Sequence, residues 1–161
     1  MANMASQHEV VIAPAKLGDV LGIEAIVKEA YSKYIERIGH PPAPMLADYA
    51  GLLESQDVYV IRSAGGEALL GSVILAVADD GQSIKINNLV VDPSAQGRGL
   101  GRVLMDHAEH VARSEGLGAL TLFTNVKMYE NIGFYTKLGF VETDRRAEGP
   151  YERVYFRKGL D

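Results

Sequence analysis

The pattern of apolar and polar positions divides the chain into strands and helices. Short runs of β-forming residues, several of them alternating between apolar and polar, predict seven strands. They cover residues 10–13, 58–63, 69–78, 84–91 and 119–124, a stretch that begins at Phe140, and residues 151–158. Glycine-containing turns join the second, third and fourth strands into an antiparallel meander. The fifth strand follows a helix, so we expect it to lie parallel to the fourth with a right-handed crossover.

Apolar residues three and four positions apart predict four helices, at residues 20–38, 45–53, 100–115 and 128–138. Asp19 can cap the first helix. The connection at 39–44, which contains His40, is either a substrate-facing loop or an ordinary link between helices. Asn87 and Asn88 interrupt a predicted strand, so we expect a β-bulge there, or else a solvent-facing kink.

The composition is that of a single globular domain. The chain has 161 residues, of which 47% are hydrophobic, and its mean hydropathy is +0.00. We expect a loose N-terminus over residues 1–8 and one domain over residues 9–161. A net charge of −5 argues against non-specific nucleic-acid binding, which depends on basic patches. No apolar run reaches the roughly eighteen residues of a membrane span, so we expect a cytoplasmic protein.

A glycine-rich loop, Gln96-Gly97-Arg98-Gly99-Leu100-Gly101, separates a predicted strand from a predicted helix. Glycines let another molecule approach the backbone, and the unpaired amides of a helix's first turn attract a negative group, most often a phosphate. The loop could also be only a tight turn before the helix.

A P-loop would need a Lys after Gly101, where Arg102 stands. A dinucleotide fingerprint needs another glycine spacing and a later acidic residue, which is absent. A third phosphate-binding pattern, Q/R-x-x-G-x-G/A, is matched by Gln96, Gly99 and Gly101.

A second motif follows at Asn131-x-x-Phe134-Tyr135-x-x-Leu138-Gly139-Phe140. Together with the loop, it resembles the two signatures of the GCN5-related N-acetyltransferase (GNAT) family, in that family's order. The resemblance extends over nearly the whole chain and implies the GNAT-type acyl-CoA N-acyltransferase fold. That fold is an α/β (α+β) arrangement, in which about four helices flank a mixed, mostly antiparallel sheet of six to seven strands.

The resemblance also implies an activity, the transfer of an acetyl group from acetyl-CoA to an amine. Tyr135 matches the tyrosine that protonates or hydrogen-bonds the departing thiolate, although its spacing equally suits a core aromatic. The residues expected to bind acetyl-CoA are Leu89, Val90, Val91, Gln96, Gly97, Arg98, Gly99, Leu100, Gly101, Arg102, Asn131, Phe134 and Tyr135. Asn131 departs from the family pattern, because many relatives place the asparagine where this chain has Met128.

The general base is not evident from the sequence. Many relatives carry a Glu on the strand before the loop, whereas this chain has two asparagines, which cannot accept a proton usefully. The other candidates are Glu36, His40, Asp48 and Glu142, or a chain of water molecules. The missing carboxylate keeps one alternative open, an acyl-CoA-binding sensor with little catalytic activity.

The chain contains no cysteine. Disulfides, thiolate metal sites and a cysteine acyl-enzyme are therefore excluded. We expect the amine to attack directly in a ternary complex, without a metal. The expected partners are acetyl-CoA and an unidentified amine, with no nucleic acid and no membrane. The resemblance also makes a homodimer possible.

Overall fold

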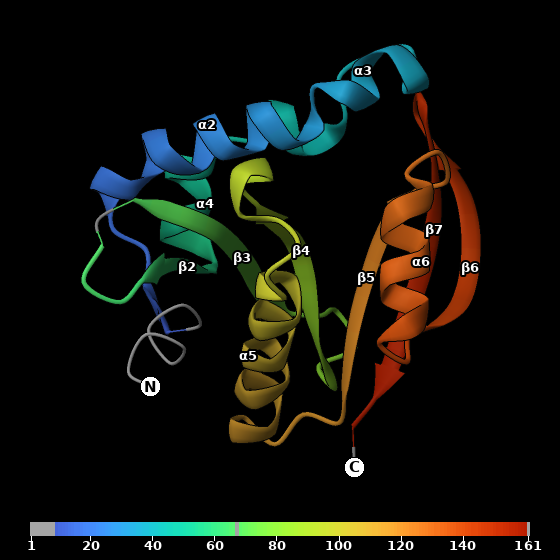
Figure 1. Ribbon diagram of the computed structural model, residues 1–161. Helices are drawn as coiled ribbons and strands as arrows, with labels where there is room; N and C mark the ends of the chain where they lie inside the picture. The colour runs from blue at the N-terminus through green and yellow to red at the C-terminus, as the bar shows by residue number, and fades with distance from the viewer. Residues whose placement is uncertain (1–8, 67, 161) are drawn as a thin grey trace.

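The computed structural model describes residues 9–66 and 68–160, so the N-terminal residues 1–8 lie outside the described part. Seven strands form one sheet in the order β1-β2-β3-β4-β5-β7-β6 (Figure 1). The strands are β1 (Val10–Pro14), β2 (Asp57–Ser63), β3 (Leu69–Val77), β4 (Ser83–Val91), β5 (Ala119–Asn125), β6 (Val141–Glu148) and β7 (Tyr151–Gly159). Among these seven described strands, only β4 and β5 pair in parallel. The predicted mixed, mostly antiparallel sheet is therefore confirmed.

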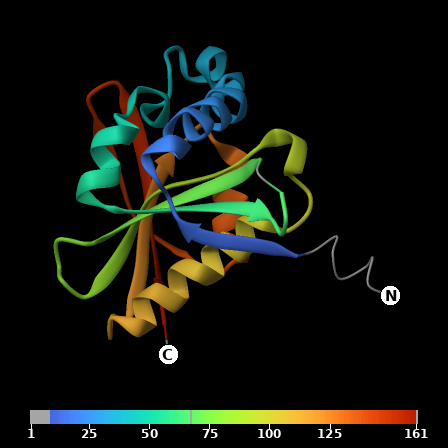
Figure 2. The same cartoon turned by 90° about the vertical axis from the view of Figure 1, so that its left-hand side faces the viewer.

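Helices cover both faces of this sheet (Figures 1 and 2). They are α2 (Val20–Tyr31), α3 (Lys33–Ile38), α4 (Tyr49–Ser55), α5 (Leu100–Ser114) and α6 (Tyr129–Lys137). On one face, α2, α3 and α4 pack on a cluster that includes Ile23, Val60 and Ile74. On the other face, α5 and α6 pack on a second cluster that includes Leu104 and Leu120. Burial of these apolar side chains is the main force that holds the layers together.

Two of the predicted helices differ from the observed ones. The first is interrupted at Ser32, whose hydroxyl donates a hydrogen bond to the carbonyl of Lys28. A serine bonded back by four residues bends a helix. The second begins later than predicted, because the carboxylate of Asp48 accepts a hydrogen bond from the amide of Gly51 at 3.1 Å and caps α4. Residues 43–46 form a separate 3-10 turn.

Asp19 lies at the start of α2, but its carboxylate does not cap that helix. It accepts a hydrogen bond from the amide of Lys16 at 2.9 Å and pairs with Arg62. These interactions lower the pKa of Asp19, although burial acts in the opposite direction and is the largest single influence. The cap predicted from the residue type is therefore replaced by a contact with β2.

The predicted β-bulge is present in β4. Ile74 of β3 lies opposite Asn88 and Leu75 lies opposite Ile86, which leaves Asn87 as an extra residue in β4. Near the bulge, β4 and β5 diverge: only residues 83–85 pair with residues 119–121. Figure 1 shows the two strands close together at one end and apart at the other. The gap between them positions the site described next.

Candidate active site

The glycine-rich loop joins β4 to α5 through a 3-10 turn at Pro93–Ala95. Gly97 and Gly99 have positive φ angles of 86° and 77°, a conformation that favours glycine. No atom of the described residues lies within 4 Å of a Cβ built at either position, so the space above the loop is open. Gly99 is the N-cap of α5 and supplies no capping side chain. The first-turn amides of α5 can therefore bind a ligand with negative charge.

Gly101 is constrained by α6. A Cβ at this position would lie 3.1 Å from Cζ of Phe134, closer than most side-chain contacts. The absence of a side chain lets α5 approach α6 at the loop. One residue of each sequence motif therefore contributes to a single packing contact, although the motifs lie far apart in the chain.

A cavity of about 490 Å³, here called the loop cavity, extends from this loop to Tyr135. Of the predicted acetyl-CoA contacts, all but Arg98 line it: Leu89, Val90, Val91, Gln96, Gly97, Gly99, Leu100, Gly101, Arg102, Asn131, Phe134 and Tyr135. Arg98 is exposed on the loop. Lys33 and Arg102 are the cations that line the cavity. Open backbone beside two cations suits a ligand that carries phosphates.

The end of β4 presents backbone amides to the gap. A Cβ on Gly71 of β3 would lie 2.6 Å from the carbonyl oxygen of Val90, so that oxygen points toward β3. Neighbouring residues of a strand point their backbone groups in opposite directions. Leu89 and Val91 therefore direct their N–H and C=O groups toward the gap. Consistent with this, the Leu89 carbonyl accepts a hydrogen bond from the Tyr31 hydroxyl at 3.4 Å.

Tyr135 lies on α6, between the loop cavity and a second cavity. Its ring packs edge-on against Phe140, with centroids 5.8 Å apart, and its side chain is 8% exposed. Burial, and secondarily the nearby Tyr34, raises the pKa of Tyr135 to about 12. Its hydroxyl is therefore protonated at neutral pH. Because it makes no hydrogen bond to another described residue, this proton is available to a ligand.

The second cavity, here called the roofed cavity, has a volume of about 70 Å³. Its lining includes Tyr31, residues 42–44, Asn88, Phe123, Asn131, Tyr135, Tyr151 and Arg153. The Tyr151 hydroxyl donates to the carbonyl of Pro41 at 3.0 Å, and the ring of His40 lies against that of Tyr151. The connection at 39–44 and the β6–β7 turn thus form a roof over this cavity. Residues 42–44 of that connection line the cavity, and a substrate-facing role for the connection stays a prediction.

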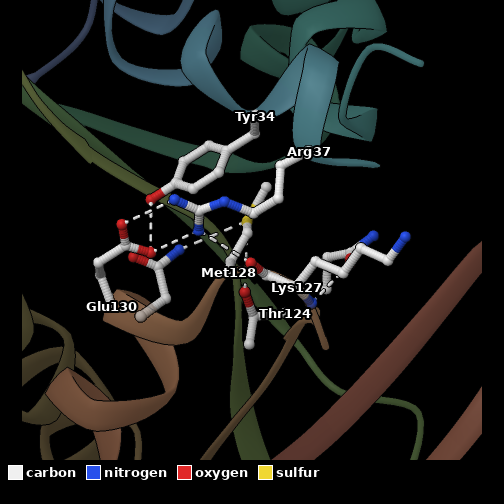
Figure 3. Close-up of polar contacts among 8 residues, drawn as sticks. Tyr34, Arg37, Thr124, Lys127, Met128 and Glu130 are labelled. Atoms are coloured by element: carbon white, nitrogen blue, oxygen red, sulfur yellow. Dashed lines mark hydrogen bonds and ion pairs between the residues drawn. The ribbon is translucent and has the colours of Figure 1, made fainter. Parts of the chain in front are cut away.

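A polar network ties α3 to the start of α6 beside these cavities (Figure 3). Arg37 pairs with Glu130 at 2.9 Å and also donates to the Lys127 carbonyl at 2.9 Å. The hydrogen bond from Arg37 lowers the pKa of Glu130 to about 2. Asn131 donates to the sulfur of Met128 at 3.6 Å. The pair of Arg37 and Glu130 holds the start of α6 against α3, and both Glu130 and Asn131 line the loop cavity.

None of the four candidate bases lines the loop cavity or the roofed cavity. Glu36 is exposed, and Asp48 caps α4. Glu142 pairs with Arg145, and a hydrogen bond from that arginine lowers its pKa. His40 lies in the roof, with its Nε2 3.2 Å from the Pro150 carbonyl.

Other residues of the site were not predicted. Tyr31, Asn88, Tyr151 and Arg153 line the roofed cavity, yet they come from α2, β4 and β7. Asn88 accepts a hydrogen bond from the Tyr31 hydroxyl at 3.1 Å. The sequence signal at Asn88 was its low strand propensity, which indicated a bulge. No local pattern distinguishes the other three.

Comparison with known proteins identifies the family. Residues 23–140 match the model of the acetyltransferase (GNAT) family, so the chain belongs to that family. An IAA acetyltransferase from Azospirillum brasilense is 29% identical over 130 residues, which are 80% of this chain and 83% of that protein. A chloroplastic serotonin N-acetyltransferase 2 from Oryza sativa subsp. japonica is 30% identical over 112 residues. The match covers 69% of this chain and 54% of the rice protein, about half its length.

The fold is also that of solved acetyltransferases. The PaiA N-acetyltransferase from Thermoplasma acidophilum, crystallised in complex with coenzyme A, superposes with a TM-score of 0.77. The alignment covers 94% of this chain and 99% of that one at 14% identity, so it shows the shared fold alone.

The chain is therefore an acetyl-CoA-dependent N-acetyltransferase, as the two motifs predicted. The sensor alternative is not favoured. Within the described residues, no helix is long and apolar enough to cross a membrane, and no cluster of three or more potential metal ligands occurs.

Proposed function

We propose that acetyl transfer takes place in the gap between β4 and β5, with acetyl-CoA in the loop cavity and the acceptor amine in the roofed cavity. The observation that supports this arrangement is that four residues line both cavities: Tyr31, Leu89, Asn131 and Tyr135. The two cavities therefore meet at Tyr135. Two substrates bound on either side of it would bring an amine next to a thioester carbonyl.

The loop cavity offers matching partners for acetyl-CoA. The amides of residues 97–102 would hold the diphosphate, assisted by Lys33 and Arg102, and the backbone of residues 89–91 would hold the pantetheine arm. Acetyl-CoA supplies the activated acetyl group. The Leu89 N–H faces the gap, where it would polarise the thioester carbonyl and stabilise the negative charge that develops on its oxygen.

Tyr135 would donate its hydroxyl proton in a hydrogen bond to the sulfur as the thiolate leaves. A phenol with a pKa of about 12 keeps its proton against an alkyl thiolate, whose conjugate acid has a pKa of about 8.5. Stabilisation by hydrogen bonding is therefore favoured over complete transfer of the proton. No carboxylate or histidine lines the described part of the roofed cavity. The proton lost by the attacking amine would thus leave through water.

Acetyl-CoA binding and thiol release test this proposal together. Thermal unfolding is measured with acetyl-CoA, and free thiol is measured during incubation with a panel of amines. Ligand at one hundred times its Kd should add about 2.7 kcal/mol of stability, which is roughly 5–10 °C for a chain of this size. Absence of stabilisation at millimolar acetyl-CoA would contradict the proposed loop-cavity site. Binding without turnover of any amine would instead support the sensor.

We also propose a cytoplasmic location and homodimeric assembly. Cell fractionation and light scattering would test them directly.

A further inference from the structure

The roofed cavity has an unusual charge balance for an amine-binding site. Arg153 is the only charged side chain among its described lining residues, and no Asp or Glu lines it. Many amines are cations at neutral pH, and a buried cation needs a counter-ion. Here the protein provides a positive charge instead of a negative one.

Arg153 is held firmly in this position. The carbon of its guanidinium lies 4.3 Å from the centre of the Phe123 ring and 5.1 Å from that of Tyr151. Its side chain is 17% exposed. Stacking on two aromatic rings fixes the guanidinium plane and leaves its N–H groups at the edge free to donate.

The acidic partner of Arg153 is outside the cavity. Glu148 lies 3.4 Å from Nη1 of Arg153, does not line the roofed cavity, and also accepts a hydrogen bond from Tyr155. The single contact leaves donors of the guanidinium unused by Glu148, since a guanidinium carries five N–H groups. The charge that faces the cavity is consequently positive.

We propose that the acceptor is a small amine that also carries a carboxylate, such as an amino acid, and that Arg153 binds the carboxylate. This inference rests on the proposed function. Arg153 lines the roofed cavity but not the loop cavity, whereas Tyr135 and Leu89 line both and would meet the acetyl group. A carboxylate at Arg153 would leave the amine directed toward these two residues. A guanidinium and a carboxylate match as a two-point hydrogen-bonded pair. A polyamine would meet repulsion with no compensating acid.

Matched acceptors test the inference. Acetylation is measured for a set of amino acids, for the corresponding decarboxylated amines, and for polyamines. We expect kcat/KM to be about ten- to a hundredfold higher for the amino acids, the usual range for a hydrogen-bonded charged group. Arg153→Gln should remove this preference and leave the Kd for acetyl-CoA unchanged. Arg153→Lys, which keeps the charge but loses the planar fork, should retain part of it.

Arg145→Gln serves as the control, because Arg145 is an exposed arginine on the adjacent strand β6 that lines neither cavity. It should keep the preference of the wild type. The inference fails if decarboxylated amines or polyamines are acetylated as well as the amino acids, or if Arg153→Gln slows all acceptors equally. Either result leaves the proposed function intact. Binding of acetyl-CoA with no acetylation of any amine would count against both this inference and the proposed function.

Discussion

At the scale of single residues, the role proposed for Tyr135 depends on a hydroxyl that is difficult to ionise. Burial of Tyr135 against Phe140 and Phe156 raises its pKa to about 12. A hydroxyl with a raised pKa donates a hydrogen bond but rarely releases its proton. We therefore expect Tyr135 to stabilise the transition state, in which negative charge accumulates on sulfur, and to contribute little to binding in the ground state.

Replacing Tyr135 with Phe tests this role. Tyr135→Phe keeps the ring and removes the donor, so we expect kcat to fall about a hundredfold, with the Kd for acetyl-CoA within about threefold of the wild type. Steady-state kinetics and calorimetry measure the two quantities. Tyr129→Phe, on the same helix but 63% exposed, is the control and should change neither. An unchanged kcat in Tyr135→Phe would remove Tyr135 from the chemistry.

At the scale of elements, the local sequence determined most of what was predicted. The loop, α5 and the bulge in β4 each follow from contiguous residues, so glycine spacing, helical periodicity and strand propensity were sufficient. The helix interruption at Ser32 was missed because it depends on one side-chain hydrogen bond to Lys28. The cap expected at Asp19 was wrong because a long-range partner, Arg62, competes for the carboxylate.

The N-terminal end of α5 provides an element-level prediction. Gly99 caps the helix with a left-handed backbone conformation, and an L-residue in that conformation costs about 1–2 kcal/mol. We therefore expect Gly99→Ala to lower the free energy of unfolding by about that amount and to weaken acetyl-CoA binding several-fold. Chemical denaturation and calorimetry measure these effects.

Gly133→Ala is the matched control. Gly133 is an exposed position within α6, with no positive φ and with no atom of the described part of the chain within 4 Å of a Cβ. Alanine there should raise stability by roughly 0.5–1 kcal/mol without changing the affinity for acetyl-CoA. Equal effects of the two substitutions would show that the left-handed backbone conformation at Gly99 does not set the cost of adding a side chain there.

At the scale of the whole molecule, the two halves of the site differ in how they are assembled. The loop cavity is formed mainly by residues 89–102 and 130–135, which carry the recognised motifs. The roofed cavity draws on α2, the 39–44 connection, β4, β5 and β7. Only the folded sheet brings Tyr31 and Arg153 together, across more than one hundred residues of sequence. Single-sequence patterns therefore predicted most residues of the loop cavity and could not predict those that only the roofed cavity contains.

The proton path gives a prediction at this scale, because no carboxylate or histidine lines the described part of the roofed cavity. The neutral amine is the reactive form, so kcat/KM should rise with pH up to the pKa of the acceptor itself. It should then stay level until Tyr135 loses its proton, near its pKa of about 12.

Two acceptors with amines of different pKa provide the measurement. The break in each pH profile should move with the acceptor. A break that stays near pH 6.5 for both acceptors, the ordinary pKa of a histidine, would point to a base in the protein and contradict the water path.

The roof has a consequence for how such an enzyme diversifies. It consists of two surface segments joined by a few contacts, among them the hydrogen bond from Tyr151 to Pro41. Surface loops accept insertions and exchanges far more readily than packed elements do. A descendant of this chain could thus bind a new acceptor through changes in these two short segments. The loop cavity, where we propose that acetyl-CoA binds, would stay unchanged.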